Sequence, residues 1–392
     1  MIPVDLPQPD HQQEAHSARL QAMISAELAA NQGWLSFERY MDLVLYAPGL
    51  GYYSAGSAKL GQAGDFVTAP ELSPVFGCCA ADALAGVLSE LGGGSVLELG
   101  AGTGRLAFDV LCELHRRDCL PQSYEILEIS ADLRERQQRC LAQLPASIRD
   151  RVIWRDRLPD SGFCGVILAN EVADALPVQR FSRLESSVME LGVIATAQGF
   201  GWSPRPASDA LCLAVDAIEQ ARGERLPEGF VSEVSLLAPR WITSLAQSLQ
   251  RGAVFLIDYG LPRVEYYNDQ RDDGTLACFY RHRLHADPFV LLGLQDVTAW
   301  VDFTGLAEAG TQAGLDVAGY TSQAHFLMDT GFDSALARHL KHADPLKSLS
   351  LRQAALTLVL PGEMGERFKC LALSKGVEVP RGFRLRDFSS RL

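Results

Sequence analysis

The sequence contains no Cys-x-x-Cys pair, although nine cysteines occur among its 392 residues. The ligand spacing typical of structural zinc sites is therefore missing, and an odd number of cysteines does not fit a complete set of disulfides. Cys78 and Cys79 lie in an alanine-rich run, where thiols act as small apolar side chains. Cysteine usage predicts a reducing compartment and no metal site.

The sequence also lacks recognisable targeting and membrane segments. No apolar run is expected to be long enough to span a bilayer, so no membrane insertion is predicted. Residues 1–7 have neither the apolar core of a signal peptide nor the arginines of a transit peptide. Internal repeats and low-complexity tracts are absent as well. Together these features predict a cytoplasmic protein.

An excess of basic residues is the third absence. The chain has 35 Lys and Arg against 48 Asp and Glu, for a net charge of -13. A protein that binds a nucleic-acid backbone needs positive charge, so no nucleic-acid partner is predicted. An acidic surface would attract a basic peptide. The length gives room for one large domain with insertions or for two domains, and 47% hydrophobic residues can fill a sizeable core.

The most informative stretch, residues 96–104, is typical of a buried strand followed by a glycine turn and the start of a helix. Glycine allows positive φ and lets a ligand approach closely. In a dinucleotide-binding turn counted from Gly100, position 105 would be glycine, but it is Arg105. Glu98 precedes the turn, and a carboxylate there would repel a pyrophosphate. The turn Gly100-x-Gly102-x-Gly104 therefore predicts a cationic or amino-acid-bearing ligand and disfavours a nicotinamide oxidoreductase.

Strand and helix patterns then alternate four times, which indicates a parallel sheet with crossover helices. Ligands bind such sheets beyond the carboxyl ends of the strands. Side chains that can hydrogen bond follow several predicted strands: Glu128, Asp156, Asn170 with Glu171, and Asp258. Glu128 is predicted to accept the ribose hydroxyls of a nucleoside. Asp156 is placed either to meet an adenine amino group or to form a turn.

The N-terminal part is predicted to begin with disorder over residues 1–16 and to continue with two helices, over 20–28 and 37–45. The loop that follows is rich in glycine and aromatic residues and carries Asp65, Thr68 and Glu71. Such a long loop indicates a lid over the glycine turn, and the alternative is a surface loop held down by its tyrosines.

Two units are predicted from these patterns. Residues 1–94 would hold the N-terminal helices and the lid loop, and residues 95–392 would form a Rossmann-like core. Insertions are expected at about 182–250 and 261–300. The first of them reads as a hairpin over 184–195, an irregular stretch over 199–206 and an amphipathic helix.

With these residues in place, the chain resembles the MidA family of class I S-adenosylmethionine (SAM) methyltransferases from Tyr46 to Ser374. The segments that carry the resemblance are Gly64 to Glu71, Glu98 to Gly104, Asn170 to Pro177, Asp258 to Gly260, Gly274 to Leu276, Asp302-Phe303 and Met364 to Lys369. Three positions depart from the family pattern: Val172-Ala173, Gln179 and Trp300.

The resemblance implies a mostly parallel α/β Rossmann-like sheet, SAM as cofactor, and a protein arginine as acceptor. The family includes a mitochondrial factor that dimethylates an arginine of a respiratory complex I subunit, so such a subunit is one implied partner. A small-molecule O or N acceptor and a SAM-binding assembly chaperone stay open as alternatives. Pairing of two chains into a homodimer also stays open.

The resemblance also implies roles for individual residues. The implied cofactor-binding residues are Asp65, Thr68, Glu98, Gly100, Gly102, Gly104, Glu128, Asp156 and Asn170. The implied catalytic residues are Glu171, Asp174, Asp258 and His282, with Asp65 and Glu71 also on the lid side. Carboxylates suit an arginine acceptor, because guanidinium is always charged and is held bidentately by acids. No metal is required for methyl transfer from a sulfonium.

Overall fold

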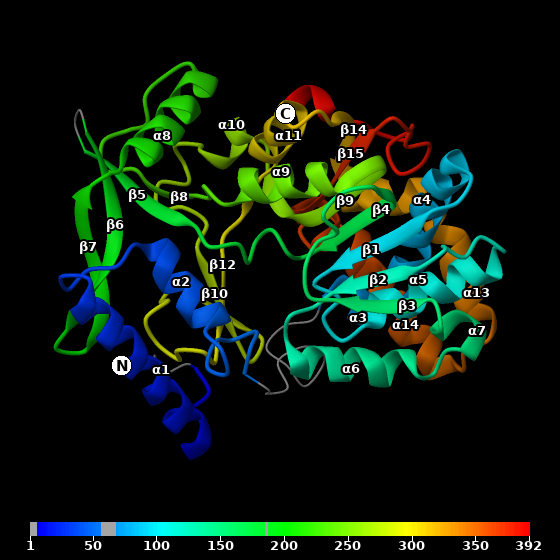
Figure 1. Cartoon of the computed structure of the whole chain (residues 1–392), viewed down its shortest axis with the longest axis horizontal. Coiled ribbons are helices and arrows are strands. Elements are labelled where there is room, and N and C mark those ends of the chain that lie inside the picture. The colour runs from blue at the N-terminus through cyan, green and yellow to red at the C-terminus, as the bar shows by residue number, and fades with distance from the viewer. Residues whose placement is uncertain (1–5, 56–67, 185–186) are drawn as a thin grey trace.

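The structure is a computed structural model of the chain, and it describes residues 6–55, 68–184 and 187–392. Figure 1 shows two groups of elements, a large sheet with its helices on the right and two smaller sheets with α1, α2 and α8 on the left. The helices before residue 160 are α1 (His11–Ala30), α2 (Phe37–Tyr46), α3 (Ala69–Leu72), α4 (Pro74–Leu91), α5 (Arg105–Arg116), α6 (Ala131–Leu141) and α7 (Ala146–Arg149). The later helices are α8 (Asp209–Arg222), α9 (Ala238–Ser248), α10 (Arg263–Tyr266), α11 (Phe303–Gln312), α12 (Gln323–Asp329), α13 (Phe332–Lys341), α14 (Pro345–Val359), α15 (Met364–Arg367) and the 3-10 helix η1 (Ser389–Arg391).

The large sheet has the order β14-β15-β9-β4-β1-β2-β3, with the short β13 paired to β9. Its strands are β1 (Ser95–Leu99), β2 (Tyr124–Leu127), β3 (Val152–Arg155), β4 (Phe163–Asn170), β9 (Leu249–Leu261), β13 (Val301–Asp302), β14 (Asp316–Ser322) and β15 (Phe368–Lys375). Helical crossovers join the first strands, so β3, β2, β1, β4 and β9 run parallel. Strand β15 runs against both of its neighbours. The predicted α/β fold with a mostly parallel sheet is confirmed.

Both faces of the large sheet are covered by helices. Val96 on β1 packs with α4 and α5, whereas its neighbour Leu97 packs with α9 and α11. Adjacent residues of a strand point to opposite faces, so a continuous apolar run is what a sheet buried on both sides requires. This burial keeps the sheet rigid beneath the strand ends that carry the predicted site.

Helix α4 corrects the expectation that no apolar run could span a bilayer. It is 18 residues long and apolar enough by length and composition, but 67% of it is buried inside the protein. It also carries Asp82, a buried acid paired with Arg117 and Arg381 from other parts of the chain. A paired acid and extensive protein contacts identify α4 as a core helix.

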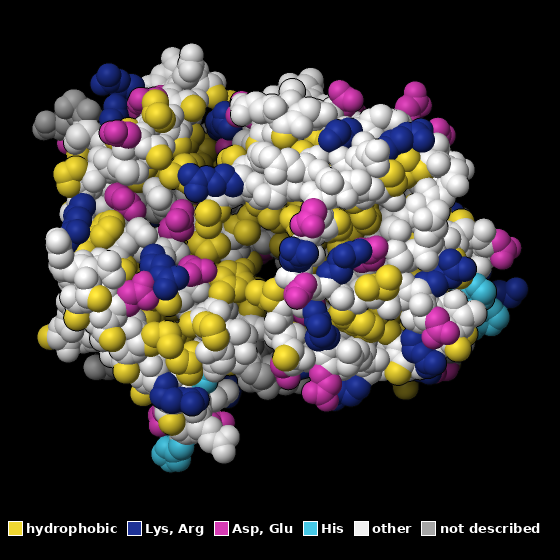
Figure 2. Space-filling model, viewed as in Figure 1, with side chains coloured by type: hydrophobic (Ala, Val, Ile, Leu, Met, Phe, Trp, Pro, Cys, Tyr) yellow, Lys and Arg dark blue, Asp and Glu magenta, His cyan; other side chains and the backbone are white. Residues whose placement is uncertain are grey.

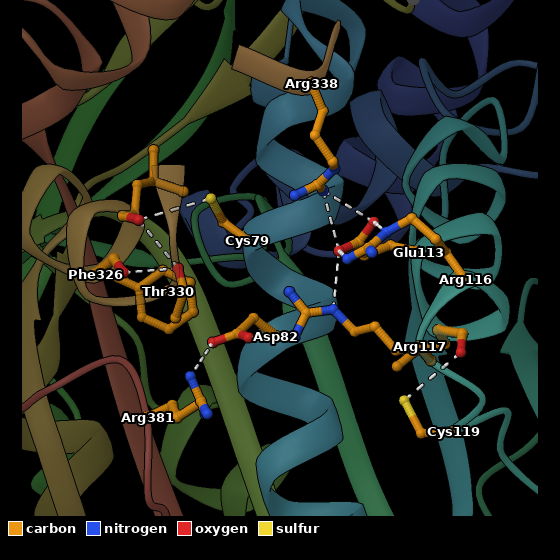
Figure 3. A network of polar contacts seen from close by, with 12 residues as sticks. Cys79, Asp82, Glu113, Arg116, Arg117, Cys119, Phe326, Thr330, Arg338 and Arg381 are labelled. Carbon is orange, nitrogen blue, oxygen red and sulfur yellow. Dashed lines mark hydrogen bonds and ion pairs between the residues drawn. The ribbon is translucent and has the colours of Figure 1, made fainter. Parts of the chain in front are cut away.

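The same charged cluster fixes α5 and α13 beside α4 (Figure 3). Glu113 on α5 is buried and accepts hydrogen bonds from Arg116, Arg117 and Arg338. Burial acts to raise the pKa of Glu113, but the three guanidinium groups outweigh it and lower that pKa to about 2. The carboxylate therefore stays charged, and its three partners stay bound, across the neutral pH range.

One strand of the smaller sheets and the start of helix α1 differ from the prediction. The strands of these sheets are β5 (Gln179–Leu184), β6 (Ser187–Thr196), β7 (Gly199–Pro206) and β8 (Val231–Val234), and then β10 (Ala277–Tyr280), β11 (Arg283–His285) and β12 (Asp296–Thr298). The stretch predicted to be irregular is strand β7, which tolerates its prolines because it lies at the edge of its sheet. Helix α1 begins within the stretch predicted to be disordered, because Asp10 forms a capping box with Gln13.

Helices α1 and α2 pack against these smaller sheets and form a separate hydrophobic cluster. Its members include Leu20 of α1, Tyr40 of α2, Val193 of β6 and Val297 of β12. The N-terminal helices are thus joined to the inserted strands, which come much later in the chain. The predicted division at residue 94 stays a prediction.

Candidate cofactor and acceptor site

A cavity of about 450 Å³ lies where β1, β2 and β4 end. One wall comes from the large sheet and the glycine turn, and the opposite wall includes Tyr46, Pro48, Tyr53 and Ser54 from the N-terminal part. Figure 2 shows a hollow between the two groups of elements with hydrophobic side chains on its walls. The cavity therefore joins parts of the chain that are far apart in sequence.

The glycine turn between β1 and α5 has the backbone that its sequence predicts. Gly100, Gly102 and Gly104 have φ angles of 63°, 52° and 86°. Residues with a Cβ atom are strained at such positive φ angles, whereas glycine is not. A Cβ atom on Gly100 would lie 3.0 Å from a methyl group of Val172, and one on Gly104 would lie 3.0 Å from the Cα atom of Gln137. The turn thus needs glycine both for its conformation and for space.

Glu98 lies directly below the turn and contributes to the cavity wall. Its side chain is buried and accepts a hydrogen bond of 2.7 Å from the Tyr124 hydroxyl. Burial raises the pKa of Glu98 to about 7, although the bond from Tyr124 opposes this shift. A cationic group bound nearby would favour the charged carboxylate.

Glu128 follows β2 and is held in place by two donors. The Ser130 amide binds one carboxylate oxygen at 2.8 Å, and the Gln137 side-chain amide binds the other at 3.0 Å. Gln137 also donates to the carbonyl of Gly102, so it links Glu128 to the glycine turn. Ile129, next in the chain, is 77% exposed and lines the cavity. A fixed acid and an uncovered apolar side chain therefore lie next to each other.

Asn170 is the last residue of β4, Glu171 follows it, and both line the same cavity. Glu171 accepts hydrogen bonds from the Ala69 amide at 3.2 Å and from the Asn170 amide group at 3.1 Å. Its φ angle of 54° is strained for a glutamate, and such strain is common at functional sites. Burial, and then the charge of Asp174, raise the pKa of Glu171 to about 8. The Asn170 Oδ1 atom is buried and has no hydrogen-bond partner among the residues that the structure describes.

Asp258 and Asp174 lie behind this wall rather than in it. Asp258 accepts hydrogen bonds from the amides of Val172, Ala173 and Asp174 with one oxygen and from that of Tyr259 with the other. Burial, followed by repulsion from Asp174 and Glu171, raises the pKa of Asp258. The Asp258 carboxylate faces the backbone of the loop that carries Glu171, and its predicted contact with an acceptor stays a prediction.

The other predicted residues fall into three groups. Thr68 and Glu71 line the cavity, and Glu71 accepts a hydrogen bond from Thr103. Asp65 lies outside the described residues. Asp156 and His282 do not line the cavity, and their predicted roles stay predictions.

The local structure explains why Asp156 and His282 lie outside the cavity lining. Asp156 is an exposed residue just after β3, which forms the far edge of the large sheet. His282 belongs to the tight turn between β10 and β11. Among the residues that the structure describes, no cluster could hold a metal ion.

Several cavity residues are not among the predicted site residues, and they include Tyr46, Tyr53, Ile129 and Trp241. Trp241 comes from α9, which lies near the end of the predicted insertion at about 182–250, so no local motif points to it. The density of aromatic residues over 46–53 was a signal for the two tyrosines, but it gave no direction for their side chains.

Comparisons with known proteins agree with this geometry. Residues 80–321 match the model of a family described as S-adenosyl-L-methionine-dependent methyltransferases. The mitochondrial protein arginine methyltransferase NDUFAF7 homolog of Drosophila melanogaster is 30% identical and aligns with 96% of this chain and 89% of its own. The NDUFAF7 protein of Danio rerio is also 30% identical, over 86% of this chain and 82% of its own.

A solved structure from Burkholderia thailandensis, bound to S-adenosyl-homocysteine, is 41% identical and superposes with a TM-score of 0.92. The superposition covers 99% of this chain and 100% of the Burkholderia thailandensis chain. The prediction of a cytoplasmic protein is contradicted, because the curated relatives are named as mitochondrial. With its sheet order, glycine turn and strand-end acids in the arrangement described above, the chain belongs to the MidA family of class I SAM-dependent methyltransferases.

Proposed function

We propose that this methyltransferase transfers the methyl group of SAM to an arginine side chain of a protein. The observation that carries the proposal is the pair of hydrogen-bond acceptors on the cavity wall, the Glu171 carboxylate and the Asn170 Oδ1 atom, which has no partner within residues 6–55, 68–184 and 187–392. A guanidinium group brings several N–H donors and a charge, which match this pair. The names of the curated relatives support the same acceptor.

The cavity residues fit the cofactor. Glu98 and the glycine turn would receive the cationic amino group and backbone of the methionine portion, and Glu128 would accept the ribose hydroxyls. An adenine ring would cover the exposed side chain of Ile129. When bound, SAM supplies an electrophilic methyl group on its sulfonium.

The residues of the chain would then position the acceptor and exclude water. Ionised Glu171 would hold the guanidinium so that one nitrogen faces the cofactor, and its carboxylate would receive the proton that this nitrogen loses. Asp258 is a positioning residue, because it holds the backbone of the loop behind Glu171. A respiratory complex I subunit as substrate and a homodimer stay predictions.

Labelling with radioactive SAM tests the proposal. Purified protein is incubated with an extract of cells that lack it, and the labelled proteins are hydrolysed and analysed by mass spectrometry. We expect methylarginine that requires added protein. Label on lysine or only on small molecules would contradict an arginine acceptor.

Changing Glu128 to Ala should weaken binding of S-adenosyl-homocysteine by about tenfold to a hundredfold, because hydrogen bonds to a charged acceptor contribute about 1.5–3 kcal/mol. Titration calorimetry measures the dissociation constant. Removal of the ribose 2′-hydroxyl from the ligand should have little further effect in the variant. If the losses of binding free energy from Glu128→Ala and from removal of the 2′-hydroxyl simply add, Glu128 does not bind the ribose.

The activity should rise with pH because Glu171 must be ionised to hold the cation. The raised pKa of about 8 places the midpoint of kcat/KM near pH 8 in the free enzyme. A bound guanidinium favours the carboxylate, so the midpoint of kcat should be lower. Initial rates at constant ionic strength from pH 6 to 9 test both values. A flat profile over this range would contradict a role for the ionised form.

A further inference from the structure

The wall opposite the large sheet contains two tyrosines with a defined arrangement. Tyr46 at the end of α2 and Tyr53 after it have ring centroids 5.6 Å apart and ring planes inclined by 21°. Both line the cavity that also holds Asn170 and Glu171. The Tyr46 hydroxyl donates a hydrogen bond of 2.9 Å to the carbonyl of Ala175, four residues after Glu171. The stacked rings are thus tied to the loop that carries the acceptor-binding carboxylate.

The hydroxyl groups of both tyrosines are already used by the protein. The Tyr53 hydroxyl lies 3.0 Å from each carboxylate oxygen of Asp296, which is buried on β12. Burial raises the pKa of Tyr46 and of Tyr53, and the charge of Asp296 adds to the shift. Both phenols therefore stay protonated at neutral pH and do not act as bases. Because both hydroxyl groups are hydrogen bonded within the protein, the part of each side chain left for a ligand in the cavity is its ring.

An aromatic ring attracts a cation to its face, and a flat guanidinium stacks on such a ring better than a compact, strongly hydrated ammonium does. The geometry points to Tyr46 and Tyr53 as residues that select a guanidinium over an ammonium beside Glu171. This inference rests on the proposed arginine acceptor and names the groups that recognise it. Glu171 alone would bind either cation.

Two cofactor analogues test the inference without a known protein substrate. Both keep the adenosine and amino-acid portions, and one carries a guanidine and the other an amine in place of the transferable methyl group. We expect the wild-type protein to bind the guanidine analogue more tightly. Tyr46→Leu and Tyr53→Leu, made separately, should each reduce this preference by about tenfold, within the range of a desolvated cation–π contact.

Tyr46→Phe and Tyr53→Phe are the matched controls, because they keep the ring and remove the hydroxyl. The two Phe variants should keep the preference for the guanidine analogue. Only variants that bind S-adenosyl-homocysteine as tightly as the wild type does are included in the comparison. Leu variants that retain the full preference would overturn the role of the rings. A wild-type protein that binds S-adenosyl-homocysteine but shows neither the preference nor arginine methylation would instead overturn the proposed function.

Discussion

Replacement of Glu171 by Gln should lower kcat for arginine methylation by about 10²- to 10³-fold, the usual loss when one charge-stabilising group is removed from a reaction site. The side chain keeps its shape and its bonds to Ala69 and Asn170 can re-form, but the negative charge that holds a guanidinium is gone. Affinity for S-adenosyl-homocysteine should change little. Single-turnover rates and calorimetry measure the two quantities.

The same variant has a second readout that does not depend on activity. The pKa of Glu171 is raised in the fold, from 4.5 to about 8, so the native state binds an extra proton between these values. The contribution of Glu171 to the free energy of unfolding is therefore fully present below about pH 4.5 and is lost as the pH rises to about 8. Glu171→Gln should flatten this part of the stability profile. An unchanged profile together with full activity would contradict both roles.

Replacement of Asp258 by Ala should lower the free energy of unfolding by at least about 3 kcal/mol, because several buried N–H groups lose their acceptor and each costs about 1–3 kcal/mol. These groups are the amides of residues 172, 173, 174 and 259. Residues 172–174 belong to the loop that also carries Glu171, so the rate of methylation should fall together with the stability. Urea unfolding followed by circular dichroism measures the change.

Asp156→Ala is the matched control for this experiment. Asp156 is an exposed strand-end acid of the same type, and its loss should change stability by less than about 0.5 kcal/mol. Asp258→Asn should fall between the two, because it keeps one carbonyl oxygen. If Asp258→Ala and Asp156→Ala lower the free energy of unfolding equally, the inferred structural role of Asp258 is wrong.

Local patterns were enough to predict the sheet, the glycine turn and the position of Glu128 and Glu171. In each case the strand, its end and the following turn lie within a few residues, so the sequence carries the information. Glycine at 100, 102 and 104 is required by backbone angles that the structure confirms. Ser36 caps α2 by an equally local contact, because its side chain accepts a hydrogen bond from the Arg39 amide.

Contacts between distant segments could not be predicted in this way. Asp258 lies near the end of β9 as Asn170 lies at the end of β4, yet only the packing of the loop shows that the Asp258 carboxylate faces backbone amides. The wall formed by Tyr46 and Tyr53 depends on α2 packing against the inserted strands. Trp241 reaches the cavity from α9 through the same kind of long-range arrangement.

The place of β15 in the large sheet has a consequence for how the chain is made. Residues 368–375 enter between β9 and β14, so they supply a hydrogen-bonding partner to both. During synthesis this strand leaves the ribosome after β9 and β14, and until then the edge of β9 that it will pair with presents unpaired backbone groups on an apolar strand. The nascent protein must therefore keep this edge protected from other chains until residues 368–375 have emerged.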